Sequence, residues 1–181
     1  MNMKRLAIVA LGFGCFASGV LVGPLLAQAG RANFSIDQIK GKEPKAAATF
    51  LLDGALQLAE NGSWERIAVG RAWYLGGEKA KGQEILDKVT TSRSVESSDW
   101  FRVGRVYAEA GEWEKATAAF DKALAMKSGD DSGMIEYGAL ANLNKDRAKA
   151  ETLFDQAFKK SPREFWHWVG AGGSYLGVRP Q

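Results

Sequence analysis

The sequence predicts an all-α protein, an α-solenoid of stacked helical hairpins with about three full units and a partial unit at each end. A pattern recurs with a shift of 34 residues, which places Gly104 on Gly138 and Phe120 on Phe154. Within each repeat the apolar residues are spaced by three and four, the period of an amphipathic helix. Only four prolines occur in 181 residues. A fixed period of this length is typical of stacked repeats, because one hairpin cannot bury both of its faces alone.

The first 29 residues have the layout of a secretory signal peptide and are predicted to lie outside the repeats. Residues 1–5 are positively charged, residues 6–26 are almost wholly apolar, and residues 27–29 form a small-x-small cleavage signal. Cleavage after Ala29 predicts a periplasmic or secreted bacterial protein. The apolar segment is also long enough to span a bilayer. A retained inner-membrane anchor, with the repeats facing the periplasm, is therefore the alternative.

Cys15 is the only cysteine and lies inside the apolar segment. A lipidated cysteine is disfavoured there, because residues 12–14 lack the leucine and small-residue pattern of a lipoprotein site. If the chain is cut after Ala29, it retains no cysteine. Such a chain has neither disulfides nor thiol chemistry.

Residues 30–43 are polar and poorly periodic, and they are predicted to form a linker. Pro44 suits the first turn of a helix. This helix, within residues 44–62, is predicted to cap the array as the second half of a degenerate repeat, because Leu52 falls in the same repeat position as Phe120.

Residues 63–96, 97–130 and 131–164 are predicted to be the three full units. One repeat position is occupied by Gly70, Gly104, Gly138 and Gly172. Glycine inside a helix costs about 1 kcal/mol relative to alanine. Its recurrence therefore predicts that two helix backbones approach each other closely at this position.

Residues 165–181 are expected to supply a partial unit with only its first helix. Trp168 falls in the repeat position of Trp100, so we expect it to be buried against the third unit. Trp166 lies about 200° round the helix from it and is expected to be exposed. This aromatic end could allow self-association through the C-terminal helix.

The candidates for catalysis or metal binding lack the partners that such chemistry requires. His167 is the only histidine and has no cysteine near it in the sequence. The glycine-rich residues 170–173 follow no predicted strand, so they are a weak match to a phosphate-binding loop. Asp130 and Asp131 lack the further spaced oxygen ligands of a calcium loop and suit a helix cap. We therefore predict no catalytic residues, no metal and no cofactor, and the chain is not expected to be an enzyme.

The charge balance argues against nucleic acid as a partner. The formal net charge is +3, and Lys4 and Arg5 in the N-terminal segment contribute two of these charges. Phosphate binding requires a basic stripe, which the repeats lack.

The pattern Trp100-x-x-Val103-Gly104-x-x-Tyr107, followed by Ala116, Phe120 and Ala123, resembles the tetratricopeptide repeat (TPR) family. The resemblance covers about residues 63–181 and implies a right-handed solenoid. Residues 63–96 depart from the pattern, with Arg66 in place of the aromatic residue and Gly82 in place of alanine. Pro162 closes the third unit only.

The resemblance implies binding of a protein or peptide. In similar proteins the first helices of successive units line a concave groove. In this register the groove would be lined by Trp64, Ile67, Arg71, Tyr74, Phe101, Arg105, Glu109, Ile135, Ala139 and Asn142. Arg71 and Arg105 share a repeat position, so their charges are expected to stack along the groove. We therefore expect an apolar or aromatic ligand segment with some acidic character. For Ile67, Phe101 and Ile135 the alternative is packing between neighbouring first helices.

Two functions follow as expectations. The first is a scaffold or assembly factor of the bacterial cell envelope. The second is a membrane-anchored accessory subunit of an envelope secretion or cytochrome-assembly complex, with residues 6–26 retained in the membrane. Neither the sequence pattern nor the resemblance identifies the partner.

Overall fold

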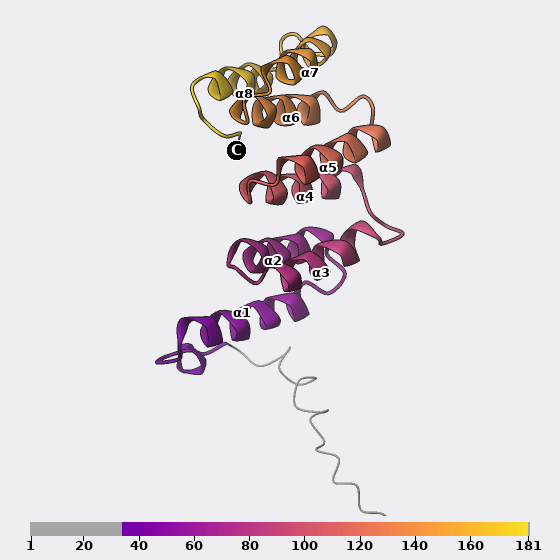
Figure 1. Ribbon diagram of the computed structural model, residues 1–181. Helices are drawn as coiled ribbons and strands as arrows, with labels where there is room; N and C mark the ends of the chain where they lie inside the picture. Colours follow the sequence, from indigo (N-terminus) through magenta and orange to yellow (C-terminus); the bar gives the residue numbers. More distant parts are fainter. Residues whose placement is uncertain (1–33, 181) are drawn as a thin grey trace, which may run out of the picture. The chain divides into compact units, whose positions relative to one another are not determined.

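The computed structural model describes residues 34–180, which are helical apart from their connections (Figure 1). After a short 3-10 helix, η2, come eight α-helices. Their bounds are η2 Ile36–Gln38, α1 Pro44–Leu58, α2 Ser63–Leu75, α3 Lys79–Thr90, α4 Ser97–Glu109, α5 Trp113–Met126, α6 Asp131–Leu143, α7 Arg147–Lys160 and α8 Phe165–Tyr175. The described residues contain no strand, so the all-α prediction is confirmed. None of these helices combines the length and apolar character needed to cross a bilayer. The predicted signal peptide or anchor lies outside the described residues.

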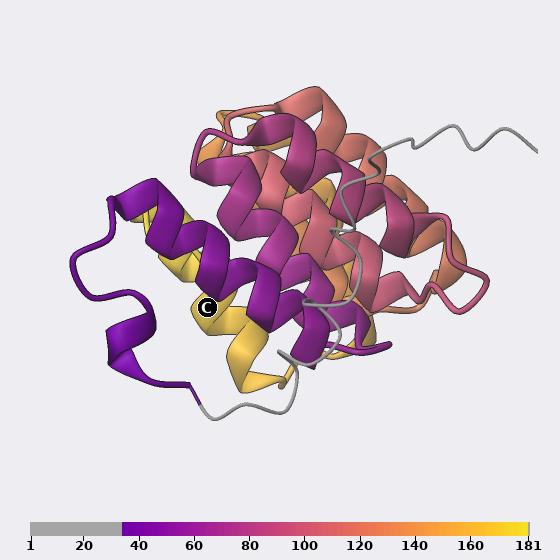
Figure 2. The same cartoon turned by 90° about the horizontal axis from the view of Figure 1, so that it is seen from below.

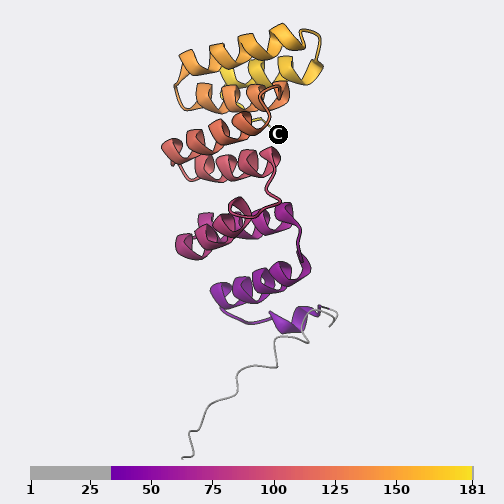
Figure 3. The same ribbon diagram turned by 90° about the vertical axis from the view of Figure 1, so that its right-hand side faces the viewer.

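Consecutive helices pair as hairpins, α2 with α3, α4 with α5, and α6 with α7. The pairs follow one another in single file (Figure 3), and Figure 2 shows them behind one another with α1 nearest the viewer. The helix α1 packs on α2, and α8 packs on α6 and α7. This arrangement confirms the predicted solenoid of helical hairpins.

The core of the middle hairpin is aromatic. The side chain of Phe120 is fully buried and its ring centre lies 4.8 Å from that of Tyr137 on α6. Trp113 and Phe101 also pack on Phe120. Large side chains thus fill the space between the second and third hairpins.

The glycine that recurs in the first helix of each hairpin packs against different groups in different hairpins. A Cβ atom at Gly104 would lie 2.5 Å from the ring of Phe120, and one at Gly138 would lie 2.6 Å from the ring of Phe154. In these two hairpins the glycine accommodates an aromatic ring, and the predicted close contact of two backbones is wrong for Gly104. The close approach occurs instead in the first hairpin.

In the first hairpin the backbones of α2 and α3 meet at Gly82. A Cβ atom there would lie 2.5 Å from the backbone nitrogen of Tyr74 and 2.7 Å from the carbonyl oxygen of Gly70. Leu86 takes the place of the aromatic ring and is fully buried. The smaller side chain lets the two helices approach more closely, which explains why glycine replaces alanine at position 82.

The prediction that Trp168 is buried is wrong, because 63% of its surface is exposed. Its ring packs on Phe158 and its indole Nε1–H donates to the carbonyl of Pro162 at 3.0 Å. The buried side of α8 is formed by His167, Ala171 and Ser174. Within residues 34–180 no second helix pairs with α8, so the side that carries Trp168 remains open.

The turns of the three hairpins share one left-handed residue. Gly77, Gly111 and Lys145 follow one another at the repeat spacing and have φ angles of 95°, 76° and 69°. Glycine adopts this conformation without a Cβ penalty, whereas the third turn uses a lysine.

We expect the substitution Lys145→Gly to raise the free energy of unfolding by about 0.5–1 kcal/mol. Glycine removes the steric penalty of the left-handed conformation, and this gain exceeds the stability lost because glycine gives the unfolded chain more conformational entropy. Urea denaturation followed by circular dichroism measures this difference. The substitution Lys127→Gly, at an extended helix end with φ −139°, is the control and should not stabilise the chain. A destabilised Lys145→Gly variant would contradict the expectation.

Candidate functional site

The candidate site is the surface formed by the first helices of the hairpins, α2, α4 and α6, together with α8. We call it the first-helix face. Its exposed or half-buried residues include Trp64, Arg71, Arg102, Arg105, Glu109, Ser132, Glu136, Asn142 and Trp166. The family resemblance assigns ligand binding to this side of the helices.

Several residues predicted to line the groove are instead part of the core. Ile67 and Tyr74 are each 3% exposed, and Phe101 and Ile135 are each 5% exposed. Their side chains fill the space between neighbouring first helices, as Phe101 does where it packs against Gly133. Packing between helices, the alternative interpretation for Ile67, Phe101 and Ile135, is what their burial indicates. Ala139, which was also predicted to line the groove, is fully buried as well.

The remaining predicted residues are accessible. Trp64 is 54% exposed, and the guanidinium of Arg102 lies 3.4 Å from its ring centre. Asn142 is half-buried and donates from its amide nitrogen to the hydroxyl of Ser174 at 3.0 Å. The first-helix face is therefore amphipathic, with an aromatic platform at one end.

The two arginines whose charges were expected to stack along the groove are each paired with a carboxylate. Arg71 donates from Nε to a carboxylate oxygen of Glu109 at 2.7 Å. Arg105 donates from Nη2 to Glu136 at 3.1 Å. Each arginine thus pairs with a carboxylate on the next first helix. This pairing neutralises the charges from which an acidic ligand was expected, so that expectation loses its basis.

Of the two glutamates that pair with arginines on this face, Glu136 is more buried than Glu109, with side chains 19% and 28% exposed. Burial raises the pKa of its carboxyl group, although the nearby Arg105 acts in the opposite direction. The ion pair with Arg105 therefore supplies the compensation that a buried carboxylate needs.

A pocket of about 380 Å³ opens between α6, α8 and the C-terminal residues 178–180. It is lined by Ser132, Ile135, Glu136, Trp166, His167, Val169, Gly170, Gly173, Val178, Arg179 and Pro180. The walls are mainly apolar, with Glu136 as the buried acidic group. The sequence contained a signal for this part of the site, because Val169 follows Ile135 at the repeat spacing.

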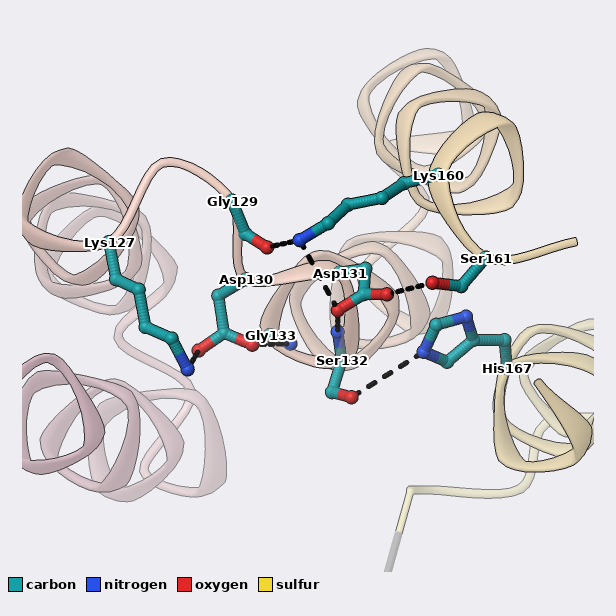
Figure 4. Close-up of polar contacts among 9 residues, drawn as sticks. All are labelled: Lys127, Gly129, Asp130, Asp131, Ser132, Gly133, Lys160, Ser161 and His167. Atoms are coloured by element: carbon teal, nitrogen blue, oxygen red, sulfur yellow. Dashed lines mark hydrogen bonds and ion pairs between the residues drawn. The ribbon is translucent and has the colours of Figure 1, made fainter.

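A polar network beside the pocket ties the start of α6 to α7 and α8 (Figure 4). The hydroxyl of Ser161 donates to Asp131, and this bond lowers the pKa of the Asp131 carboxyl group. Lys160 donates to the carbonyl of Gly129. Ser132 Oγ lies 3.4 Å from Nε2 of His167, which is almost completely buried. The network thus joins the start of α6 to the end of α7 and, through Ser132 and His167, to α8.

This network does not have the connections of a Ser-His-Asp triad. Asp131 is engaged by Ser161, and Nδ1 of His167 has no hydrogen-bond partner among the described residues. A triad needs a carboxylate on that nitrogen to orient the imidazole. Nor do the side chains of residues 34–180 include a group of three or more His, Cys, Asp or Glu residues suited to a metal ion.

A second polar junction joins the first hairpin to the second. Glu112, in the turn before α5, accepts a hydrogen bond from the hydroxyl of Tyr74 at 2.8 Å and pairs with Lys115 and Lys79. Hydrogen bonds from the two lysines, with Lys115 first, lower the pKa of Glu112 to about 2. The junction links the turn between α4 and α5 to the first hairpin.

Comparison with known protein families gives one match. The tetratricopeptide repeat model matches residues 97–130, the stretch that contains α4 and α5. Searches of curated proteins and of solved structures gave no match. Repeats of this kind typically act as non-catalytic protein interaction modules. The match covers the middle one of three helical hairpins, so residues 97–130 are similar to a tetratricopeptide repeat, and further helical hairpins lie on either side of them.

Proposed function

We propose that this protein is a non-catalytic scaffold or assembly factor of the bacterial cell envelope that binds a peptide segment of its partner on the first-helix face. The observation that carries this proposal is the tetratricopeptide repeat at residues 97–130, a repeat type that commonly binds proteins. Its first helix, α4, supplies Arg102 and Arg105 to the face described above.

The geometry favours two contact regions for such a peptide. Trp64, with Arg102 stacked on it, offers a flat aromatic surface that can hold an apolar or aromatic side chain. The pocket beside Glu136 and Val169 has the volume to take another apolar side chain. A ligand with two separated apolar residues fits this arrangement.

Photocrosslinking in cells tests the binding face. A photoreactive amino acid at Trp64 or Ser132 should give a covalent adduct with the partner, whereas one at Ala125, exposed on α5, should not. The substitution Val169→Asp introduces a charge at the pocket, and Ala125→Asp, which places the same charge on the exposed side of α5, is its matched control.

A peptide from the captured protein should bind the purified chain, and Val169→Asp should weaken this binding by at least about tenfold. Ala125→Asp should leave it unchanged. Adducts that form equally at Ala125, or binding that is insensitive to Val169→Asp, would contradict the proposal.

The envelope location is supported by the sequence of residues 1–29. The alternative function, a membrane-anchored accessory subunit of a secretion or cytochrome-assembly complex, requires residues 6–26 to be retained. Mass spectrometry of the mature N-terminus distinguishes the two. A chain that begins at Gly30 would exclude the anchored form, and an intact apolar segment would exclude the cleaved one.

A further inference from the structure

The helix α8 is a first helix whose usual partner is missing from the described residues. In α4, Gly104 is covered by Phe120, and Tyr107 is 8% exposed. At the same repeat positions of α8, Gly172 has no atom within 4 Å of an added Cβ, and Tyr175 is 49% exposed. The side of α8 on which a second helix would pack is therefore open.

The helix α1 shows the converse. Its residues Leu52, Ala55 and Leu56 pack on α2, as those of a second helix pack on the following first helix. Leu51, however, is 42% exposed, whereas Ala119 at the same repeat position of α5 is 2% exposed. The described residues include no first helix that pairs with α1.

Both of these open helices are poor in charge. The sequence of α8 contains no Asp, Glu, Lys or Arg. The only charged residues of α1 are Lys45 and Asp53, and these pair with Glu78 and Lys81 at the first hairpin. End helices of a solenoid usually present a polar outer side to water. These two present apolar side chains instead.

We propose that α8 of one chain packs against α1 of a second copy, so that the two helices complete a hairpin between the chains. The second copy is the occupant because α1 supplies what the open side of α8 lacks. Leu52 of α1 stands at the repeat position of Leu86, Phe120 and Phe154, the residues that cover the glycines inside the chain. The intermolecular contact thus continues the internal repeat interface.

This contact joins two different surfaces, so it is heterologous and leaves one free end on each outer chain. It predicts head-to-tail assembly rather than a symmetric pair of α8 helices. It uses neither the pocket nor Trp64, so it goes beyond peptide binding and can be tested separately.

Sedimentation velocity of the processed chain over a range of concentrations tests this inference. The wild type should increase in mass with concentration. The substitution Gly172→Leu places a large side chain on the open side of α8, at a position where an added Cβ meets nothing within 4 Å in its own chain. It should raise the dissociation constant by at least about tenfold. Its circular dichroism spectrum and melting temperature should show no loss of folding.

A matched pair tests the α1 side. Leu51 is 42% exposed on α1, whereas Ala119 at the same repeat position is 2% exposed inside its hairpin, so pairing with α8 should cover Leu51. Leu51→Ser should weaken association, and Met126→Ser, at a position of an internal helix that remains 51% exposed, should not. The Gly172→Leu chain retains a free α1 and the Leu51→Ser chain retains a free α8. Their mixture should therefore form heterodimers that do not grow further.

A wild type that remains monomeric at every concentration would overturn the inference, as would association that persists in Gly172→Leu. If Leu51→Ser has no effect while Gly172→Leu abolishes association, the contact is between two α8 helices and head-to-tail pairing is excluded. Equal weakening by Met126→Ser would reduce the contact to non-specific association and would also exclude the inference.

Discussion

The substitution Phe120→Ala is expected to lower the free energy of unfolding by about 3–5 kcal/mol, the range for a fully buried phenylalanine truncated to alanine. The ring is completely inaccessible to solvent. It packs against Phe101 on α4 and Tyr137 on α6, and it occupies the space beside Gly104. Removal of the ring leaves a cavity where α4, α5 and α6 meet. The fixed helix backbones can close this cavity only in part.

The position of Phe120 also predicts a loss of cooperativity. In repeat proteins, overall stability depends on the interfaces between neighbouring units. Phe120 connects the second hairpin to Tyr137 of the third. We therefore expect the variant to unfold over a broader urea range than the wild type, with an apparently smaller m-value.

Urea denaturation monitored by circular dichroism and by tryptophan fluorescence measures both effects. Met126→Ala, on the same helix but 51% exposed, is the control and should change stability by less than about 0.5 kcal/mol. A loss below about 1 kcal/mol for Phe120→Ala would show that the middle hairpin does not depend on this ring.

The repeat spacing was sufficient to predict the hairpins because the two helices of each unit pack through side chains at the same repeat positions. Phe120 and Phe154 are both buried against a glycine of the preceding helix. A large residue and a small residue that recur together therefore identify the contact between two helices. The sequence does not say whether a backbone or a side chain fills the space beside the glycine. That depends on the size of the opposing residue, as the contrast between Leu86 and Phe120 shows.

The binding face was harder to predict, because a repeat position does not determine exposure. Ile67, Phe101 and Ile135 share one position and are buried, since neighbouring first helices lie close enough to enclose them. Trp168 shares a position with Trp100 but is exposed, because its burial would require a helix that the described residues do not provide. Exposure is a property of neighbours, which the repeat pattern alone does not supply.

The charges of the face were misjudged for a similar reason. Arg71 and Arg105 share a repeat position, but their partners Glu109 and Glu136 do not. The two ion pairs span 38 and 31 residues of sequence. A search at the repeat spacing alone does not find them. They follow from the way each arginine side chain reaches the next first helix.

The substitution Gly82→Ala is expected to lower the free energy of unfolding by about 2 kcal/mol, within the range for an overpacked core. Comparison with the other repeats suggests the opposite sign, because Ala116 and Ala150 occupy this position and alanine favours a helix by about 1 kcal/mol. The structure decides between them. A methyl group at position 82 would lie 2.5 Å from the backbone nitrogen of Tyr74 and 2.7 Å from the carbonyl of Gly70. Backbone atoms cannot rotate aside, so α2 and α3 must separate.

Gly172→Ala is the matched control, since the same substitution meets no atom within 4 Å there. It should raise stability by up to about 1 kcal/mol through helix propensity alone. Thermal and urea unfolding are measured at protein concentrations low enough to keep the chain monomeric. The free energy of unfolding should then be lower than that of the wild type for Gly82→Ala and higher for Gly172→Ala. If Gly82→Ala is as stable as Gly172→Ala, then α2 and α3 do not approach as closely as the backbone contacts at Gly82 indicate, and the shared alanine of the other repeats would be the better guide.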